Sequence, residues 1–349
     1  MIKDEAPIAH GGALDEARQR HPFAPEPWID LSTGINPVPY PLPQVAPEAW
    51  ARLPLASEEM ALREAAAARY GAASAANIVA APGTQALIQL LPRLVPLGRV
   101  AVLSPTYAEH AAAWKREGHD VYEVATLTEA ETARAVVAVN PNNPTGRLIP
   151  PEDLRRAARG IERRGGLLVV DEAFMDVAEP SASLIPGLPS GALVLRSFGK
   201  MYGLAGLRLG FAVAEESLAA RLRDMLGPWA VPGPAIAIGR TALADGAWLA
   251  DARARLARDA GRLDAMLEGA ACRVMGGTAL FRLAVHPSAQ ALAETLAAHG
   301  ILVRRFSYEP GWLRFGIPGQ AAAWQRLEAA IGGDGKVGAD VCNHRPEKA

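Results

Sequence analysis

Cysteine is nearly absent from this chain, and long apolar runs are missing. Only Cys272 and Cys342 occur among 349 residues, which is too few for a disulfide framework and suits a reducing cytoplasm. No apolar run approaches the ~20 residues that a membrane-spanning helix requires. The charged start, Met1–Glu5, is followed by no apolar signal core. We therefore expect a soluble, cytoplasmic protein.

The chain also lacks an excess of charge of either sign. Lys and Arg number 36 against 37 for Asp and Glu, so the net charge is −1. This balance gives no electrostatic reason to expect nucleic acid or an anionic membrane as a partner. The seven histidines form no cluster with the spacing of metal ligands. We expect a small-molecule substrate and no metal.

Apolar strands alternate with helices through the first two thirds of the chain. From about residue 78 to residue 214, short runs rich in Val, Leu and Ala are separated by helical patterns. This alternation favours an α/β fold with a mostly parallel central sheet sandwiched by helices. The predicted strands are Ile78–Ala81, Val100–Ser104, Ala135–Asn140, Leu167–Asp171, Leu193–Phe198 and Leu209–Ala214. The predicted helices are residues 57–70, Thr84–Val95, Tyr107–Glu117 and Pro151–Arg164.

The length of the chain exceeds what one compact core usually holds, so two domains are expected. Residues 1–44, rich in Gly and Pro, are expected to form an extended strap that joins the small domain. Residues 45–230 would form the large domain, and residues 231–331 a smaller α+β domain that begins with a long helix over 235–268. Its other predicted elements are strands Cys272–Met275, Ala279–Ala284 and Trp312–Gly316 and helix Ser288–His299. Residues 332–349 are typical of a disordered tail.

A single lysine, Lys200, stands in the most informative stretch of the chain. Ser197 precedes it by three residues, Arg208 follows it by eight, and the glycines between them let backbone approach a ligand closely. A lysine that forms a Schiff base needs an aldehyde on a ring, and the Ser and Arg side chains could hold a phosphate on that ring. The stretch predicts Lys200 as a catalytic residue and pyridoxal 5'-phosphate as the cofactor.

Polar residues follow the predicted strands where such a cofactor would bind. Ligands of open parallel sheets gather at the carboxyl ends of the strands. Asp171 closes one strand, and a carboxylate there would keep the pyridine nitrogen protonated, although an acid that merely caps a strand is a common alternative. Asn143, within Asn140–Gly146, could donate to the phenolic oxygen of the ring, or simply shape a turn.

Two further groups complete the predicted cofactor site. Gly83 and Thr84 open a helix, where free backbone N–H groups bind anions, although such a pair is often only a helix cap. Tyr107 is placed to stack on the pyridine face, which makes it both a cofactor-binding and a catalytic candidate; ordinary core packing is the alternative. Together with Asn143, Asp171, Ser197, Lys200 and Arg208, these residues form one ordered set.

This ordered set resembles the class I/II aminotransferases, which belong to the fold-type I superfamily of pyridoxal-phosphate enzymes. The resemblance implies a mostly parallel sheet sandwiched by helices, with a smaller α+β domain. It also implies that Lys200 forms the covalent link to the cofactor and that Arg208 binds its phosphate. Because active sites of the family are built at a subunit interface, it implies a homodimer.

The first segments of the chain narrow the resemblance. His10–Ala17 and Ile29–Pro37 are similar to the start of threonine-phosphate decarboxylases of cobalamin biosynthesis, and the likeness extends over residues 10–331. Histidinol-phosphate aminotransferases share the later motifs. They usually carry a tyrosine where this chain has Phe174, and a second tyrosine in the stretch that corresponds to Leu53. The resemblance implies decarboxylation of L-threonine O-3-phosphate to (R)-1-aminopropan-2-yl phosphate.

Such a substrate carries a carboxylate and a phosphate, so cationic groups must lie near the site. Arg314 matches the arginine with which the superfamily grips the substrate carboxylate. For the phosphate, the candidates are Arg304, Arg305, His10, Ser32, Gly34 and Asn36. Neighbouring residues of a strand point to opposite faces, so at most one of the two adjacent arginines can serve.

Two alternatives remain open from the sequence. One is an aminotransferase acting on a phosphorylated amine such as histidinol phosphate. The other is a catalytically inactive module that keeps the fold, which the intact Lys200, Asp171 and Arg208 disfavour.

Overall fold

The computed structural model describes residue 8 and residues 10–332, and these form two compact units. Unit 1 contains residue 8 and residues 38–255, and unit 2 contains residues 10–37 and 256–332. None of the helices within the described residues is both long enough and apolar enough to cross a bilayer. Most of the expected tail, from residue 333 onward, and Cys342 lie outside the described residues.

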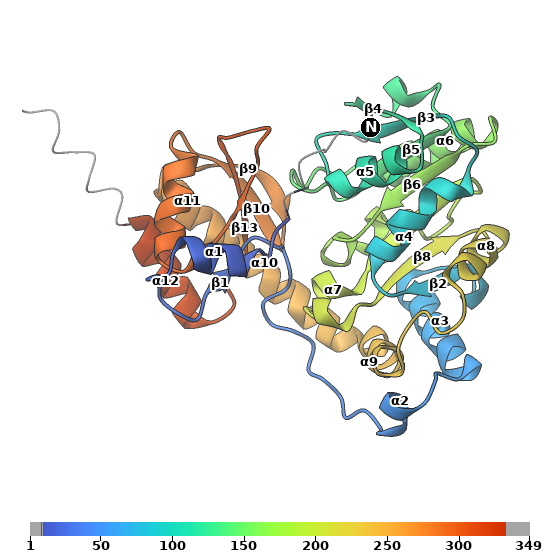
Figure 1. The fold of residues 1–349 in the computed structure, drawn as a ribbon, viewed down its shortest axis with the longest axis horizontal. Helices are drawn as coiled ribbons and strands as arrows, with labels where there is room; N and C mark the ends of the chain where they lie inside the picture. The colour runs from blue at the N-terminus through green and yellow to red at the C-terminus, as the bar shows by residue number, and fades with distance from the viewer. Residues whose placement is uncertain (1–7, 9, 333–349) are drawn as a thin grey trace, which may run out of the picture. The chain divides into compact units, whose positions relative to one another are not determined.

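Unit 1 is built on a seven-stranded sheet (Figure 1). Its neighbouring strands are parallel except around β8, which runs antiparallel to both β2 and β7. The strands, in spatial order, are β2 (Ile78–Ala81), β8 (Gly210–Ala214), β7 (Ala192–Ser197), β6 (Leu167–Asp171), β5 (Ala135–Val139), β3 (Arg99–Leu103) and β4 (Asp120–Val124). The mostly parallel α/β sheet predicted from the sequence is therefore confirmed.

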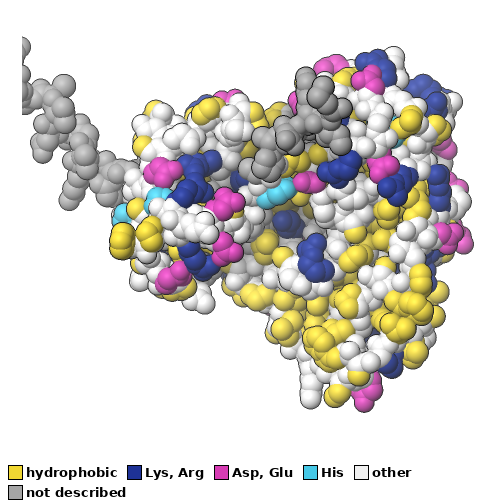
Figure 2. Space-filling view, viewed as in Figure 1, with side chains coloured by type: hydrophobic (Ala, Val, Ile, Leu, Met, Phe, Trp, Pro, Cys, Tyr) yellow, Lys and Arg dark blue, Asp and Glu magenta, His cyan; other side chains and the backbone are white. Residues whose placement is uncertain are grey.

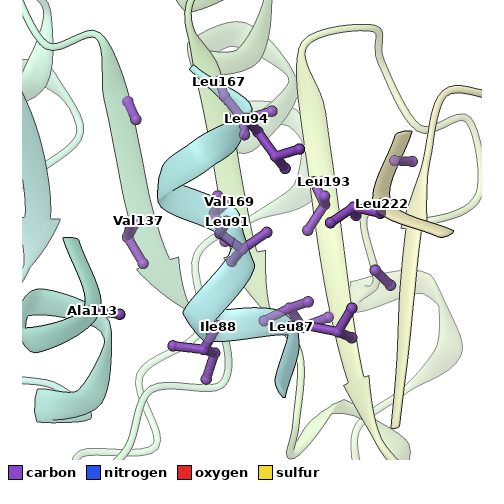
Figure 3. Packing of buried hydrophobic residues seen from close by; sticks show 14 of the residues in the cluster. Leu87, Ile88, Leu91, Leu94, Ala113, Val137, Leu167, Val169, Leu193 and Leu222 are labelled. Atoms are coloured by element: carbon purple, nitrogen blue, oxygen red, sulfur yellow. The ribbon is translucent and has the colours of Figure 1, made fainter. Parts of the chain in front are cut away.

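The inner strands of this sheet are buried over their whole length. Each residue of β5 and of β6 is buried, which explains why both read as continuous apolar runs. Figure 3 shows Leu91 beside Val169 of β6, with Leu87 and Ile88 of α4 (Thr84–Leu90) facing the same side of the sheet. This packing fixes the start of α4 above the carboxyl ends of the strands.

Helices cover the sheet of unit 1, and two of them differ from expectation. The helix predicted over Thr84–Val95 ends at Leu90 and continues as a 3-10 turn, since Pro92 has no N–H to donate. The helix predicted over 235–268 is two helices, α9 (Gly233–Ala244) and α10 (Gly246–Gly269), which are divided at Asp245. The Asp245 carboxylate accepts the N–H of Trp248 at 2.9 Å and so caps the second helix. The remaining helices of this part of the chain are α2 (Glu48–Ala51), α3 (Ala56–Tyr70), α5 (Ala108–Arg116), α6 (Pro151–Glu162), α7 (Phe198–Met201) and α8 (Glu216–Leu226).

Unit 2 contains an antiparallel sheet in the order β12-β13-β10-β9 and a parallel pair, β1 with β11. Its strands are β1 (Ile29–Asp30), β9 (Arg273–Thr278), β10 (Phe281–Val285), β11 (Ile301–Leu302), β12 (Arg304–Arg305) and β13 (Trp312–Gly316). Its helices besides the end of α10 are α1 (Leu14–Arg20), α11 (Ala289–Ala298) and α12 (Ala321–Gly332). The sequence predicted no helix at α1; burial of Ala17 with Trp28 and Ala297 stabilises this short helix.

Candidate active site

The predicted site residues of unit 1 follow three adjacent parallel strands. In the register of these strands, Val139 of β5 is opposite Asp171 of β6, and Asp171 is opposite Leu195 of β7. Asn143 lies in the loop after β5, Ser197 ends β7, and Lys200 lies in the short helix α7 that follows at once. The carboxyl ends of the three strands thus bring these residues to one edge of the sheet, as the sequence predicted.

The Asp171 carboxylate is buried, with only 4% of the residue exposed, and has two partners. Its Oδ1 accepts the N–H of Ala173 at 3.0 Å. Its Oδ2 lies 2.9 Å from Nε2 of His110, a fully buried residue of α5. An ionised carboxylate requires the proton to be on this nitrogen. Asp171 therefore has more than a strand-capping role, and His110 is a contact that the sequence did not reveal.

Tyr107 lies directly before α5, three residues ahead of His110. The two rings meet edge to face, with centroids 6.1 Å apart and an angle of 84° between their planes. The Tyr107 hydroxyl is 3.4 Å from Oε1 of Gln85, and Nε2 of Gln85 donates to Oε2 of Glu109 at 2.6 Å. Tyr107 is thus oriented by side chains from both α4 and α5, and its ring also packs against the core of unit 1.

The loop that contains Asn143 is held by its two neighbouring asparagines. Oδ1 of Asn140 accepts the N–H of Ile149 at 2.7 Å, and Oδ1 of Asn142 accepts the hydroxyl of Thr106 at 2.7 Å. Asn140 and Asn142 thus anchor the loop directly ahead of Asn143.

The four residues predicted to hold a phosphate come together at the start of α4. Gly83 has a φ of +86°, and a Cβ on it would lie 2.5 Å from Nη2 of Arg208. Ser197 is paired in register with Gly210, and a Cβ on Gly210 would lie 2.6 Å from the backbone N of Thr84. These close approaches explain why glycines occupy both positions. The arrangement places one guanidinium, two hydroxyls and the first N–H groups of a helix together, a donor set that fits a phosphate dianion.

Lys200 lies above an aromatic ring. Its Nζ is 5.5 Å from the centroid of Phe174, a residue that is 3% exposed. Phe174 follows Asp171 by three residues, so the strand end that carries the acid also supplies the ring beneath the lysine. Phe174 has no hydroxyl to donate to a cofactor.

In unit 2, Arg314 of β13 and Arg304 of β12 are direct partners across the antiparallel pair. Their side chains therefore share a face of the sheet. Arg314 is buried, at 5% exposed, and donates from Nη2 to the main-chain oxygen of Ser32. Burial, and after it the charge of Arg304, lower the pKa of Arg314 to about 10. Two like charges opposite one another, one of them buried, suit an anionic ligand.

Arg305 and Ser32 are both engaged in contacts within unit 2. Arg305, the neighbour of Arg304, pairs with Glu294 of α11 at 2.5 Å. Of the two adjacent arginines, only Arg304 is thus opposite Arg314. The Ser32 hydroxyl donates to Asp30 at 2.6 Å and accepts the N–H of Gly12 at 2.7 Å. Its hydroxyl proton is used inside the N-terminal segment.

The other predicted substrate residues belong to the same N-terminal segment of unit 2. His10 is exposed and is followed by Gly11, whose backbone packs against Ser32. Asn36 is 2% exposed, and Gly34 has a φ of +64°. The Leu31 oxygen accepts the N–H of Gly316 at 2.6 Å, which ties this segment to the strand that carries Arg314.

Comparison with known proteins places the chain among relatives of the kind that its motifs resemble. The model of the family "Aminotransferase class I and II" matches residues 30–331. A threonine-phosphate decarboxylase of Sinorhizobium sp is 48% identical over 334 residues, covering 93% of this chain and 98% of that protein. A threonine-phosphate decarboxylase of Pseudomonas aeruginosa is 44% identical over 330 residues, covering 93% and 97%.

A solved structure has the same fold. It is a histidinol-phosphate aminotransferase from Sinorhizobium meliloti in complex with pyridoxal-5'-phosphate, with a TM-score of 0.78, 20% identity, and coverage of 93% of this chain and 97% of that chain. The predicted architecture of a fold-type I pyridoxal-phosphate enzyme is confirmed. The chain belongs to the aminotransferase class I and II family.

Proposed function

We propose that this chain is a pyridoxal-phosphate-dependent decarboxylase that converts L-threonine O-3-phosphate to (R)-1-aminopropan-2-yl phosphate. The observation that carries the substrate class is the Arg304–Arg314 pair, which offers two cations on one face of a sheet. The names and the 44% and 48% identities of the two decarboxylase relatives support decarboxylation over transamination. The N-terminal resemblance implies that the product serves cobalamin biosynthesis.

The residues of unit 1 fit pyridoxal phosphate. The cofactor, when bound, supplies an electron-accepting ring that stabilises the electron pair left on the substrate when carbon dioxide departs. Lys200 would hold the cofactor covalently, Asp171 would accept the N–H of its ring, and Asn143 would donate to its phenolic oxygen. The phosphate would be bound by Gly83, Thr84, Ser197 and Arg208, which together we call the phosphate cradle. Tyr107 would stack on the ring.

The residues of unit 2 would bind and orient the substrate. Arg314 is assigned the carboxylate and Arg304 the phosphate, with His10, Gly34 and Asn36 as further candidates from the N-terminal segment. Ser32, also predicted from the sequence, gives both its donors to Asp30 and would shape this segment. The bond that breaks is the one that stands perpendicular to the cofactor ring. Two separate anion contacts would hold the substrate at both of its charged groups.

We further propose a homodimer in the cytoplasm. Support for the dimer comes from exposed hydrophobic side chains in and near α2, α3 and α9 of unit 1, where Figure 2 shows them gathered. They are Leu42, Trp50, Leu53, Leu55, Met60 and Trp229. Such a patch is expensive to leave in water. Sedimentation of Trp50→Ser/Trp229→Ser should give a lighter species, whereas Phe23→Ser, which changes an exposed phenylalanine of unit 2, should not.

A substrate panel tests the proposed reaction. The purified protein, loaded with pyridoxal phosphate, should release carbon dioxide from threonine phosphate at a rate that does not depend on added 2-oxo acid. The Lys200→Ala variant should lose this activity. Turnover of histidinol phosphate that requires 2-oxoglutarate, without release of carbon dioxide, would establish the aminotransferase alternative instead. Absence of any turnover with both substrates would favour the inactive module.

A further inference from the structure

Arg196 carries a charge that the proposed chemistry does not use. It precedes Ser197 on β7 and is 5% exposed. Its Nη1 donates to Oδ1 of Asp176 at 3.1 Å, and its Nε lies 3.5 Å from Oε2 of Glu172. Its Cζ lies 4.6 Å from the centroid of the Tyr70 ring of α3. The arginine is therefore enclosed by two acids and an aromatic face inside unit 1.

This cluster lies on the side of the sheet opposite to the cofactor residues. Successive strand residues alternate between the two faces. Asp171 of β6 faces α5, where it meets His110. Ser197 lies on the same face as Leu193 and Leu195, which belong to the core beneath α4 and α5. Arg196 turns to the other face.

The two acids are tied to further segments of unit 1. The Glu172 carboxylate accepts the hydroxyl of Ser183 at 2.7 Å and the N–H of Leu184 at 2.8 Å. The main-chain oxygen of Asp176 accepts Nε of Arg253 at 2.6 Å. Burial raises the pKa of Glu172. Asp176 thus accepts the hydrogen bond of Arg196, while Glu172 forms an ion pair with Arg196 and takes its hydrogen bonds from two neutral donors.

The residues of the cluster are close in sequence to three proposed cofactor residues. Glu172 directly follows Asp171, and its N–H donates to the oxygen of Leu195 on β7 at 2.9 Å. Arg196 directly precedes Ser197, and Lys200 comes four residues later. A shift of the Arg196–Asp176 pair would move the ends of β6 and β7 with it.

We propose that Arg196 and Asp176 are positioning residues for the cofactor site. Their buried ion pair holds the segment after β6 against the end of β7, and so fixes Asp171 relative to Ser197 and Lys200. This inference rests on the proposed function, since it concerns the binding of pyridoxal phosphate. Removal of one partner of a buried ion pair is costly because the other charge stays buried. Loss of the pair should therefore weaken cofactor binding, because it displaces the ends of β6 and β7.

The test compares Asp176→Asn with Glu172→Gln in the full chain. The affinity for pyridoxal phosphate and the visible circular dichroism of the bound cofactor are measured, together with the melting temperature. Asp176→Asn should lower the affinity at least ~10-fold and reduce the dichroic band, because small misplacements of binding groups cost that much. Glu172→Gln should change the affinity less than about twofold, since the amide oxygen still accepts the N–H of Leu184 and the bond between Arg196 and Asp176 is untouched. Arg196→Lys keeps the positive charge without the planar guanidinium and should give an intermediate loss of affinity.

The matched control is Asp264→Asn in unit 2. Asp264 forms a two-point pair with Arg282, at 2.6 and 2.8 Å. Its loss should lower the melting temperature and leave cofactor binding unchanged. A folded Asp176→Asn, or failing that Arg196→Lys, that keeps wild-type affinity and dichroism would overturn the positioning role. A wild-type protein that takes up no pyridoxal phosphate would overturn the proposed function, and this inference with it.

Discussion

Nε2 of His110 lies 2.9 Å from Oδ2 of Asp171, and the histidine is completely buried. The contact joins α5 to the carboxyl end of β6, across 61 positions in the sequence. A buried carboxylate is costly unless it is hydrogen-bonded. His110 and the N–H of Ala173 satisfy Asp171 from two directions, which leaves its position fixed before any cofactor binds.

Replacement of His110 should weaken cofactor binding. In His110→Leu, Asp171 loses one buried hydrogen bond, and we expect the affinity for pyridoxal phosphate to fall about tenfold, or roughly 1.4 kcal/mol. Titration of the visible absorption band measures the affinity. The control is His119→Leu, which removes another buried histidine, one that bonds the Pro92 oxygen at 2.9 Å. It should cost stability with no loss of affinity; equal affinities in both variants would contradict the role of His110.

Gly83→Ala should damage the phosphate cradle. The added Cβ would lie 2.5 Å from Nη2 of Arg208, at a residue whose φ is +86°. Arg208 must then move, and a charge-assisted contact to the phosphate is lost, so we expect at least ~10-fold weaker binding of pyridoxal phosphate. Gly187→Ala is the control, because Gly187 also has a positive φ, +70°, but a Cβ added there would meet no atom within 4 Å. Similar affinity in the two variants would argue against the cradle.

Much of the fold follows from local sequence because the inner strands are buried on both faces. A short, continuous apolar run between turn residues, such as Ala135–Val139, is typical of a buried strand. The edge strand Asp120–Val124 escaped prediction because it is polar and half exposed. The antiparallel direction of β8 depends on how the chain passes through α7, a property that no local pattern encodes.

The motifs predicted the candidate site residues themselves, but not the side-chain contacts that hold them in place. Lys200, Ser197 and Arg208 lie within one stretch, whereas the partner of Asp171 is on a distant helix. The sequence left open which of Arg304 and Arg305 faces the substrate. Neighbouring strand residues point to opposite faces of the sheet, but the sequence does not say which residue points to which face. Strand pairing favours Arg304, which is opposite Arg314, whereas Arg305 meets Glu294.

Cys272 should resist alkylation until high pH. Burial raises the pKa of its thiol from 9.0 to about 11. At pH 9 half of an ordinary thiol is thiolate, against about one in a hundred here, so labelling of the native protein should be about 50-fold slower than of the unfolded chain. Because the unfolded thiol ionises first, its contribution to stability is present below pH 9 and is lost as pH rises through 11. Iodoacetamide kinetics on Cys342→Ser measure this, and equal native and unfolded rates would refute it.

Arg304 and Arg305 allow a matched test of substrate recognition. They are adjacent on β12, yet Arg304 is opposite Arg314 while Arg305 pairs with Glu294. Loss of a charge-assisted contact to the substrate phosphate costs about 1.5–3 kcal/mol, so Arg304→Gln should raise the KM for threonine phosphate roughly 10- to 100-fold. Arg305→Gln removes only a partly exposed ion pair, worth up to about 1 kcal/mol of stability, and should change KM less than about twofold. Steady-state kinetics on both variants, with melting temperatures, separate the two effects. A larger KM for Arg305→Gln than for Arg304→Gln would mean that the phosphate contacts the opposite face of the sheet from the one assigned to it.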